Sequence, residues 1–135
     1  MQTWIIFALV SMFLSGMNAI LFKVAPNIDA VTLTLVNFAA ATVATFIVWI
    51  GGFVDREVSV PGVLWGVAAG VSSMLLLIAF IKALQLAPAS YVNTIRGLSA
   101  AVTVILAIIF LGEKITLAKG SGIVLAIIAG ILLTI

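Results

Sequence analysis

The stretch that decides the fold runs from Leu86 to Ile135 and reads LAPASYVNTIRGLSAAVTVILAIIFLGEKITLAKGSGIVLAIIAGILLTI. Two apolar segments flank the triplet Gly112-Glu113-Lys114. The first segment, residues 90–111, is long enough to cross a bilayer, because a helix rises about 1.5 Å per residue and the hydrocarbon core is roughly 30 Å thick. We therefore predict that this segment is a transmembrane helix.

Two strongly polar side chains, Asn93 and Arg96, lie within this predicted helix. A charged side chain inside a membrane helix is costly and usually faces protein or a water-filled cavity. Arg96 also lies about 9 Å from the start of the segment, so snorkelling to the headgroups is the alternative. Helical spacing favours the cavity, because small and polar residues share one face. This face comprises Asn93, Arg96, Ala100, Thr103 and Ala107.

The composition excludes most soluble and enzymatic classes. Of 135 residues, 65% are hydrophobic and 7% are charged, which is too little polar surface to cover a soluble globule. The chain has no cysteine and no histidine, and Tyr91 and the serines have no positioned base, so we expect no enzyme activity, no metal and no cofactor. The net charge of +2 comes from scattered residues, so nucleic acid is not an expected partner.

Five apolar segments predict an all-α membrane protein with a single transmembrane domain. The expected spans are about 4–22, 30–50, 62–84, 90–111 and 117–135. Turn and capping residues separate them: Asp29 is suited to cap the second span, Gly51-Gly52 to end it, and Pro61 to open the third. A cleaved signal peptide is the alternative for the first span, but no basic residue precedes it and four further spans follow.

Small and polar residues recur along three other spans. In the first, Ser15 and Asn18 share a face, and they either bind neighbouring helices or line a cavity. In the third, Ser73 continues a face on which Gly66 and Gly70 predict close helix approach. The fifth span carries a stripe suited to helix–helix contact at four-residue spacing, formed by Gly122, Ala126 and Gly130.

The basic residues give only a small bias in orientation. Five spans put the termini on opposite sides of the membrane. One side would then carry Arg56, Lys114 and Lys119, and the other would carry Lys23 and Lys82. The positive-inside rule leans towards a cytoplasmic N-terminus, but so small a bias permits both insertions.

Three sequence features carry a resemblance to a known family. They are the run Ala83-Leu84-Gln85-Leu86-Ala87-Pro88-Ala89-Ser90, the triplet Gly112-Glu113-Lys114, and the pattern of Gly122, Leu125 and Gly130. With these, the whole chain resembles one EamA-type repeat of the drug/metabolite transporter superfamily. Typical members fuse two such repeats in inverted orientation around a central site. The resemblance therefore implies a five-helix half transporter that forms a homodimer, possibly antiparallel, in the bilayer of a prokaryotic plasma (inner) membrane.

The related small multidrug resistance exporters differ from this chain at their binding residues. They carry a glutamate eight residues before a lysine at the end of the first helix, where this chain has Ser15. They also carry two tyrosines and a tryptophan at set distances from the proline of the tight turn. The corresponding positions in this chain are Ser73, Asn93 and Arg96. The resemblance thus implies that an acidic, aromatic cage for cations is replaced by a site for a neutral polar or anionic solute.

We predict a small secondary-type transporter of polar or anionic metabolites, acting as a dimer by alternating access. The expected small-molecule substrate site comprises Ser15, Asn18, Ser73, Asn93, Arg96 and Thr103, and the expected dimer contact comprises Gly122, Ala126 and Gly130. Alternatives are a non-transporting subunit of a heterodimer or lipid-modifying complex, a multidrug exporter with another cation site, and an ancestral-like single repeat without a physiological substrate. No carboxylate lies within a span, so no buried-acid proton relay is expected.

Overall fold

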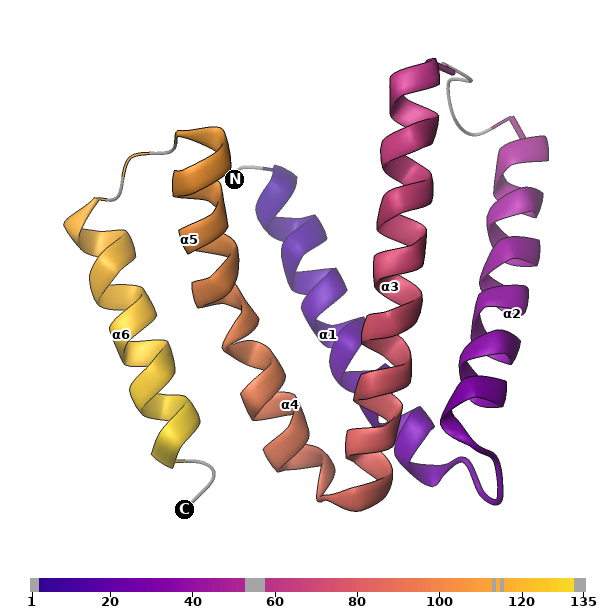
Figure 1. Ribbon diagram of the computed structural model, residues 1–135, viewed down its shortest axis with the longest axis horizontal. Coiled ribbons are helices and arrows are strands. Elements are labelled where there is room, and N and C mark those ends of the chain that lie inside the picture. The colour runs from indigo at the N-terminus through magenta and orange to yellow at the C-terminus, as the bar shows by residue number, and fades with distance from the viewer. Residues whose placement is uncertain (1–2, 53–57, 113, 115, 133–135) are drawn as a thin grey trace. The chain divides into compact units, whose positions relative to one another are not determined.

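The computed structural model describes residues 3–52, 58–112, 114 and 116–132. All secondary structure in this part of the chain is helical (Figure 1). The helices are α1 (Thr3–Val24), α2 (Ala30–Ile50), α3 (Val60–Leu86), α4 (Ala89–Gly97), α5 (Ser99–Leu111) and α6 (Leu117–Leu132).

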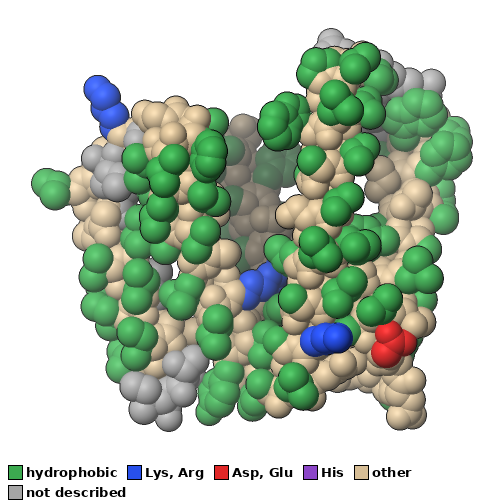
Figure 2. Space-filling model, in the orientation of Figure 1, with side chains coloured by type: hydrophobic (Ala, Val, Ile, Leu, Met, Phe, Trp, Pro, Cys, Tyr) green, Lys and Arg blue, Asp and Glu red, His purple; other side chains and the backbone are tan. Residues whose placement is uncertain are grey.

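The predicted all-α membrane fold is confirmed. Four apolar stretches are long enough to cross a bilayer, namely Thr3–Val24, Ala30–Ile50, Val60–Leu86 and Ala89–Leu111. Hydrophobic side chains cover much of the visible surface and charged ones are sparse (Figure 2). Trp65 is 77% exposed and Phe110 is 78% exposed, as expected for side chains in contact with lipid.

Parts of the predicted chain lie outside the described residues. These are the polar loop Asp55-Arg56-Glu57, Glu113 of the predicted hinge, and residues 133–135 of the predicted fifth span. The described part of that span is α6, a shorter apolar helix than the other four stretches.

The chain divides into two compact units. One comprises residues 1–20 and 87–135, and the other comprises residues 21–86. Helix α1 passes from the first unit into the second, where its last turn leads into the connection to α2.

The second unit is built around the connection between α1 and α2. Asn27 has a φ of 52°, a left-handed conformation that asparagine tolerates, and so lets the chain reverse. Asp29 caps α2 as predicted, accepting hydrogen bonds from the backbone N–H groups of Val31 and Thr32. Its carboxylate also accepts a bond from the Thr32 hydroxyl.

Two side chains fasten this connection to the carboxyl end of α3. The Lys23 Nζ donates to the Leu84 carbonyl, one of the last carbonyls of α3. The Gln85 Nε2 donates to the Ile28 carbonyl at 3.0 Å. Lys23 thereby satisfies a carbonyl that a helix end leaves without an intrahelical partner. Buried side chains of this unit gather on the same segments: Phe22, Ala30, Thr34, Phe80, Ile81 and Leu84.

Helix α3 begins as predicted, with Pro61 in its first turn. The Ser59 hydroxyl accepts a hydrogen bond from the Gly62 N–H at 3.2 Å and so acts as a cap. The predicted close helix approach at Gly66 and Gly70 is not seen, because a Cβ added at either glycine would meet nothing within 4 Å in the described structure. Both glycines instead border open grooves beside α2.

In the first unit, the predicted fourth span is interrupted at Leu98, which separates α4 from α5. Helix α6 contacts both of them. Gly130 of α6 is buried, and a Cβ added there would lie 3.0 Å from Leu98 Cδ2. Glycine therefore gives the Leu98 side chain room to pack against α6. Helix α5 ends at Gly112, whose φ of 65° and N–H bond to the Ala107 carbonyl form a left-handed cap.

Candidate substrate-binding site

A polar pocket of about 260 Å³ lies within the first unit, between α1 and the α4–α5 segment. Met12, Ser15 and Gly16 of α1 form one wall. The opposite wall is formed by Asn93, Arg96, Gly97 and Ser99. Hydroxyl, amide and guanidinium groups thus line one pocket.

A hydrogen bond between Arg96 and Ser15 joins the two walls. The Arg96 Nη1 donates to the Ser15 Oγ at 3.0 Å, and both side chains are partly buried. This bond orients the guanidinium without neutralising it, because the serine hydroxyl is uncharged. No carboxylate occurs in the sequences of α1, α4 or α5. The described residues that line the pocket therefore include one cation and no carboxylate.

The interruption at Leu98 lies between two residues that line the pocket, Gly97 and Ser99. The Leu98 N–H bonds to the Ile95 carbonyl at 3.1 Å, and the Ala101 N–H bonds to the Leu98 carbonyl at 3.0 Å. Both bonds span three residues, so the chain tightens locally from α-helical to 3₁₀ geometry. Gly97 and Ser99, which flank Leu98, are weaker helix formers than leucine or alanine. Both line the pocket, so the interruption lies in the pocket wall.

Ser99 is the first residue of α5 and lines the pocket. Arg96 lies in the last turn of α4. The discontinuity thus lies between the guanidinium-bearing residue and the serine hydroxyl of the same wall.

Comparison of the sequence with known protein families identifies a family of membrane transporters. The profile of the EamA-like transporter family matches residues 2–135. The chain belongs to the EamA-like transporter family. This family is part of the drug/metabolite transporter superfamily, so the predicted resemblance is confirmed. No curated protein and no solved structure matches the chain.

Membership of the EamA-like family identifies the chain as an integral membrane protein and a membrane transporter of the drug/metabolite type. Members of this family are transporters and not enzymes. The family match covers all five predicted spans, and it does not select a substrate.

Three of the six predicted site residues come together in this EamA-like chain. Ser15, Asn93 and Arg96 line the same pocket. Asn18 is exposed and lies outside the lining, and the exposed Thr103 donates its hydroxyl to the Ser99 carbonyl at 2.9 Å. Ser73 is exposed on α3, in the other unit. A substrate-binding role for all six residues stays a prediction.

Four lining residues were not predicted, although the sequence carries a signal for them. Met12, Ser15 and Gly16 have the spacing i, i+3, i+4, which places them on one helical face. Asn93, Arg96 and Gly97 have the same spacing. A polar face defined to include glycine and methionine would therefore contain Met12, Gly16 and Gly97. Ser99 follows Arg96 by three residues and depends on the local geometry at Leu98.

The predicted dimer residues differ in their surroundings. Gly130 packs against Leu98 of its own chain, whereas a Cβ added at Gly122 would meet nothing within 4 Å. Gly122 is exposed, and the side chain of Ala126 lies outside the described part of the structure. The dimer contact stays a prediction, and Gly122 is the described position best suited to it.

Proposed function

We propose that this EamA-like chain transports small polar metabolites that carry an anionic group, and that the Arg96 pocket binds that group. The observation that supports the proposal is the Arg96–Ser15 hydrogen bond inside a pocket whose helices contain no carboxylate. A guanidinium held in this way presents a planar set of donors that matches carboxylate or phosphate.

The other lining groups suit a small polar solute. Asn93 offers an amide that both donates and accepts hydrogen bonds, and Ser99 offers a hydroxyl at the start of α5. The pocket volume of about 260 Å³ is smaller than that of sites that hold drug-sized molecules, which begin at roughly 300 Å³. A compact carboxylate or phosphate ester therefore fits the proposal better than a large aromatic cation.

Alternating access by a dimer is the second part of the proposal. Inverted-repeat transporters place their substrate site where two repeats meet, often beside an interrupted helix. This chain matches the family profile once along its length and interrupts one predicted span at Leu98 beside Arg96. We propose that a second copy supplies the other repeat in a prokaryotic plasma (inner) membrane. The exposed face around Gly122 would contribute to the contact between copies.

Thermal unfolding with candidate solutes tests the anion site. Purified protein would be heated with a panel of carboxylates, phosphate esters, nucleosides and sugars, followed by uptake into proteoliposomes for each solute that raises the unfolding midpoint. We expect a stabilising carboxylate or phosphate ester in the wild type. Arg96→Lys should weaken the shift, because the charge stays but the planar donor set is lost, and Arg96→Ala should abolish it.

Removal of a different positive charge, outside the pocket, is the control for the loss of charge in Arg96→Ala. Lys114 is exposed in the connection between α5 and α6, so Lys114→Ala should retain the ligand-induced shift of the wild type. An equal shift in the wild type and in Arg96→Ala would place the ligand elsewhere. That result would return Arg96 to the alternative in which its side chain reaches the headgroups.

A further inference from the structure

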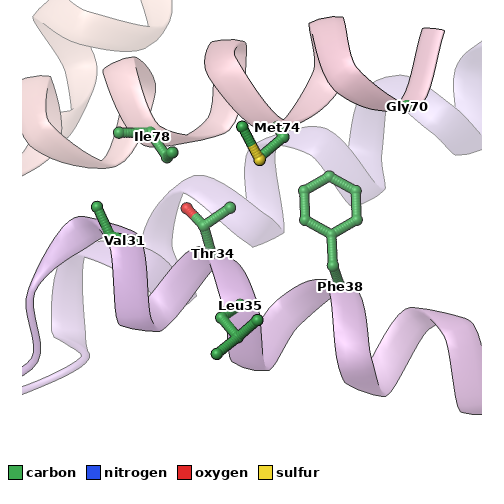
Figure 3. Close-up of a pocket in the computed structure, with 7 residues that line it drawn as sticks. All are labelled: Val31, Thr34, Leu35, Phe38, Gly70, Met74 and Ile78. Atoms are coloured by element: carbon green, nitrogen blue, oxygen red, sulfur yellow. The ribbon is translucent and has the colours of Figure 1, made fainter. Parts of the chain in front are cut away.

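A second, apolar groove lies within the other unit, between α2 and α3 (Figure 3). Its volume is about 380 Å³. Val31, Leu35 and Phe38 line it from α2, and Gly70, Met74 and Ile78 line it from α3. The groove is thus formed by two membrane-spanning helices and lies along their length.

The groove offers hydrocarbon contacts and almost no polar recognition. Its only hydroxyl is that of Thr34, which donates to the Ala30 carbonyl at 2.7 Å and is therefore satisfied within its own helix. A Cβ added at Gly70 would meet nothing within 4 Å, so this glycine leaves open space between the helices. A lining without free polar partners favours an apolar occupant, because a polar group placed there would lose its hydrogen bonds.

A cation lies beyond one end of the groove. Gly70, Met74, Ile78 and Lys82 follow one another at four-residue spacing, so they form one row on α3. Lys82 is exposed about 6 Å beyond Ile78 along the helix axis. In the described part of the chain, no hydrogen bond or ion pair engages its ammonium group. A lysine near the end of a membrane helix extends its charge to the headgroup region.

The nearby acidic residue is already engaged at the start of α2. The Asp29 carboxylate accepts two backbone N–H groups and the Thr32 hydroxyl. Its negative charge therefore faces the partial positive charge of the α2 start. The apolar row and the lysine that follows it are therefore complementary to an amphipathic anion, whose apolar part would lie along the row and whose charge would meet the ammonium group.

We propose that this groove binds one acyl chain of a bilayer phospholipid whose anionic headgroup contacts Lys82. The row from Gly70 to Lys82 is about 18 Å long, close to half of the roughly 30 Å hydrocarbon core, so it matches one leaflet. An acyl chain in that leaflet would lie against Met74 and Ile78 with its headgroup at the level of Lys82. This site is separate from the Arg96 pocket and does not depend on the proposed substrate.

Native mass spectrometry of the full chain in detergent tests the proposal. The probes are phosphatidylglycerol, which is anionic, and phosphatidylcholine, which is zwitterionic, with identical acyl chains. We expect the wild type to retain one phosphatidylglycerol in preference to phosphatidylcholine by about fivefold, the ratio expected for one lysine near an anionic headgroup. Equal retention of both lipids would overturn the headgroup contact.

Two leucine substitutions, one in the groove and one beside it, test whether the groove holds the acyl chain. Gly70→Leu should fill the groove and remove the retained lipid, whereas Ala69→Leu adds bulk at an exposed neighbouring position and should leave lipid retention unchanged. Unfolding midpoints of both variants would establish that they are folded. Unchanged retention in Gly70→Leu, or equal loss in both variants, would contradict the proposal.

Charge removal tests the headgroup contact separately. Lys82→Gln should abolish the preference for phosphatidylglycerol while retaining lipid binding, and Lys114→Gln should keep the wild-type preference. A wild-type dimer that becomes a monomer in Gly70→Leu, without loss of lipid, would instead assign the groove to a second copy. That outcome would overturn the lipid proposal.

Discussion

At the scale of a single residue, Asp29 couples the start of α2 to pH. The hydrogen bond from the Thr32 hydroxyl, followed by backbone N–H bonds from Thr32 and Val31, lowers the pKa of this carboxyl below its ordinary value. These bonds favour the charged form in the folded chain. The carboxylate therefore adds stability above the unfolded-state pKa, and this stability is lost as the pH falls through the lower folded-state pKa.

Replacement of Asp29 should reveal this pH dependence. We expect Asp29→Ala to lower the unfolding midpoint at neutral pH, because α2 loses its cap. The difference from the wild type should shrink as the pH falls below about 4, the ordinary carboxyl pKa, and towards the lower folded-state pKa, because protonation progressively removes the charged cap. Thermal unfolding in detergent between neutral and acidic pH measures this. A difference that stays constant at every pH would mean that Asp29 acts without its charge.

The sequence predicts which single side chains are unusual, but it does not predict which residues of other helices they contact. The cost of a charge in a membrane helix singles out Arg96, and helical spacing puts Asn93 on the same face; both line one pocket in the structure, and their role in binding stays a prediction. Its partner Ser15 is 81 positions away in the sequence, so their hydrogen bond depends on how α1 packs in three dimensions. Spacing within one helix cannot predict such a contact, and so Asn18 and Thr103 were predicted with equal weight.

At the scale of helices, the contact between Leu98 and Gly130 connects the interrupted span to α6. Gly130→Leu should lower the free energy of unfolding by about 1–3 kcal/mol, because the added side chain would collide with Leu98. Gly122→Leu, in the same helix, should leave the stability of the monomer unchanged, because nothing described in its own chain lies within 4 Å of an added Cβ, whereas it should weaken the proposed contact between copies. Denaturant unfolding of the two variants compares them directly.

A compensating change sharpens the comparison. Leu98→Ala makes room at the contact, so the double variant Gly130→Leu, Leu98→Ala should be more stable than the sum of the single effects implies. Additive effects would indicate that the two positions do not share one contact.

Helix ends were predictable from local chemistry, and the interruption was not. Asp29, Pro61 and Pro88 carry start and turn signals that act within a few residues, and helices begin beside each of them. Leu98 is a strong helix former and carries no such signal. Gly97 and Ser99 weaken the helix on either side of it without fixing where it breaks, and the Leu98 side chain packs against a glycine of α6 that is distant in sequence.

At the scale of the whole molecule, membership of the EamA-like family accounts for the all-helical fold and its apolar surface. The family profile matches residues 2–135, a range that includes all five predicted spans. The spans could be predicted from the sequence because each depends on the length of an apolar segment and on the turn residues beside it. Assembly is different, since it depends on which exposed faces meet in the bilayer. Every apolar face is compatible with lipid, so hydrophobicity alone does not distinguish a partner surface.

The balance of basic residues makes orientation testable. Two lysines added in the 55–57 loop should drive the N-terminus fully inside, and two added after Ala25 should drive it outside, because the native difference is only three basic residues against two. Reporter fusions at Ile135 measure the orientation of each variant. If the working dimer is antiparallel, each fixed variant alone should lose transport, and co-expression of the two should restore it. Transport by either fixed variant alone would contradict an antiparallel pair, and unchanged reporter signals would show that loop charge does not determine orientation.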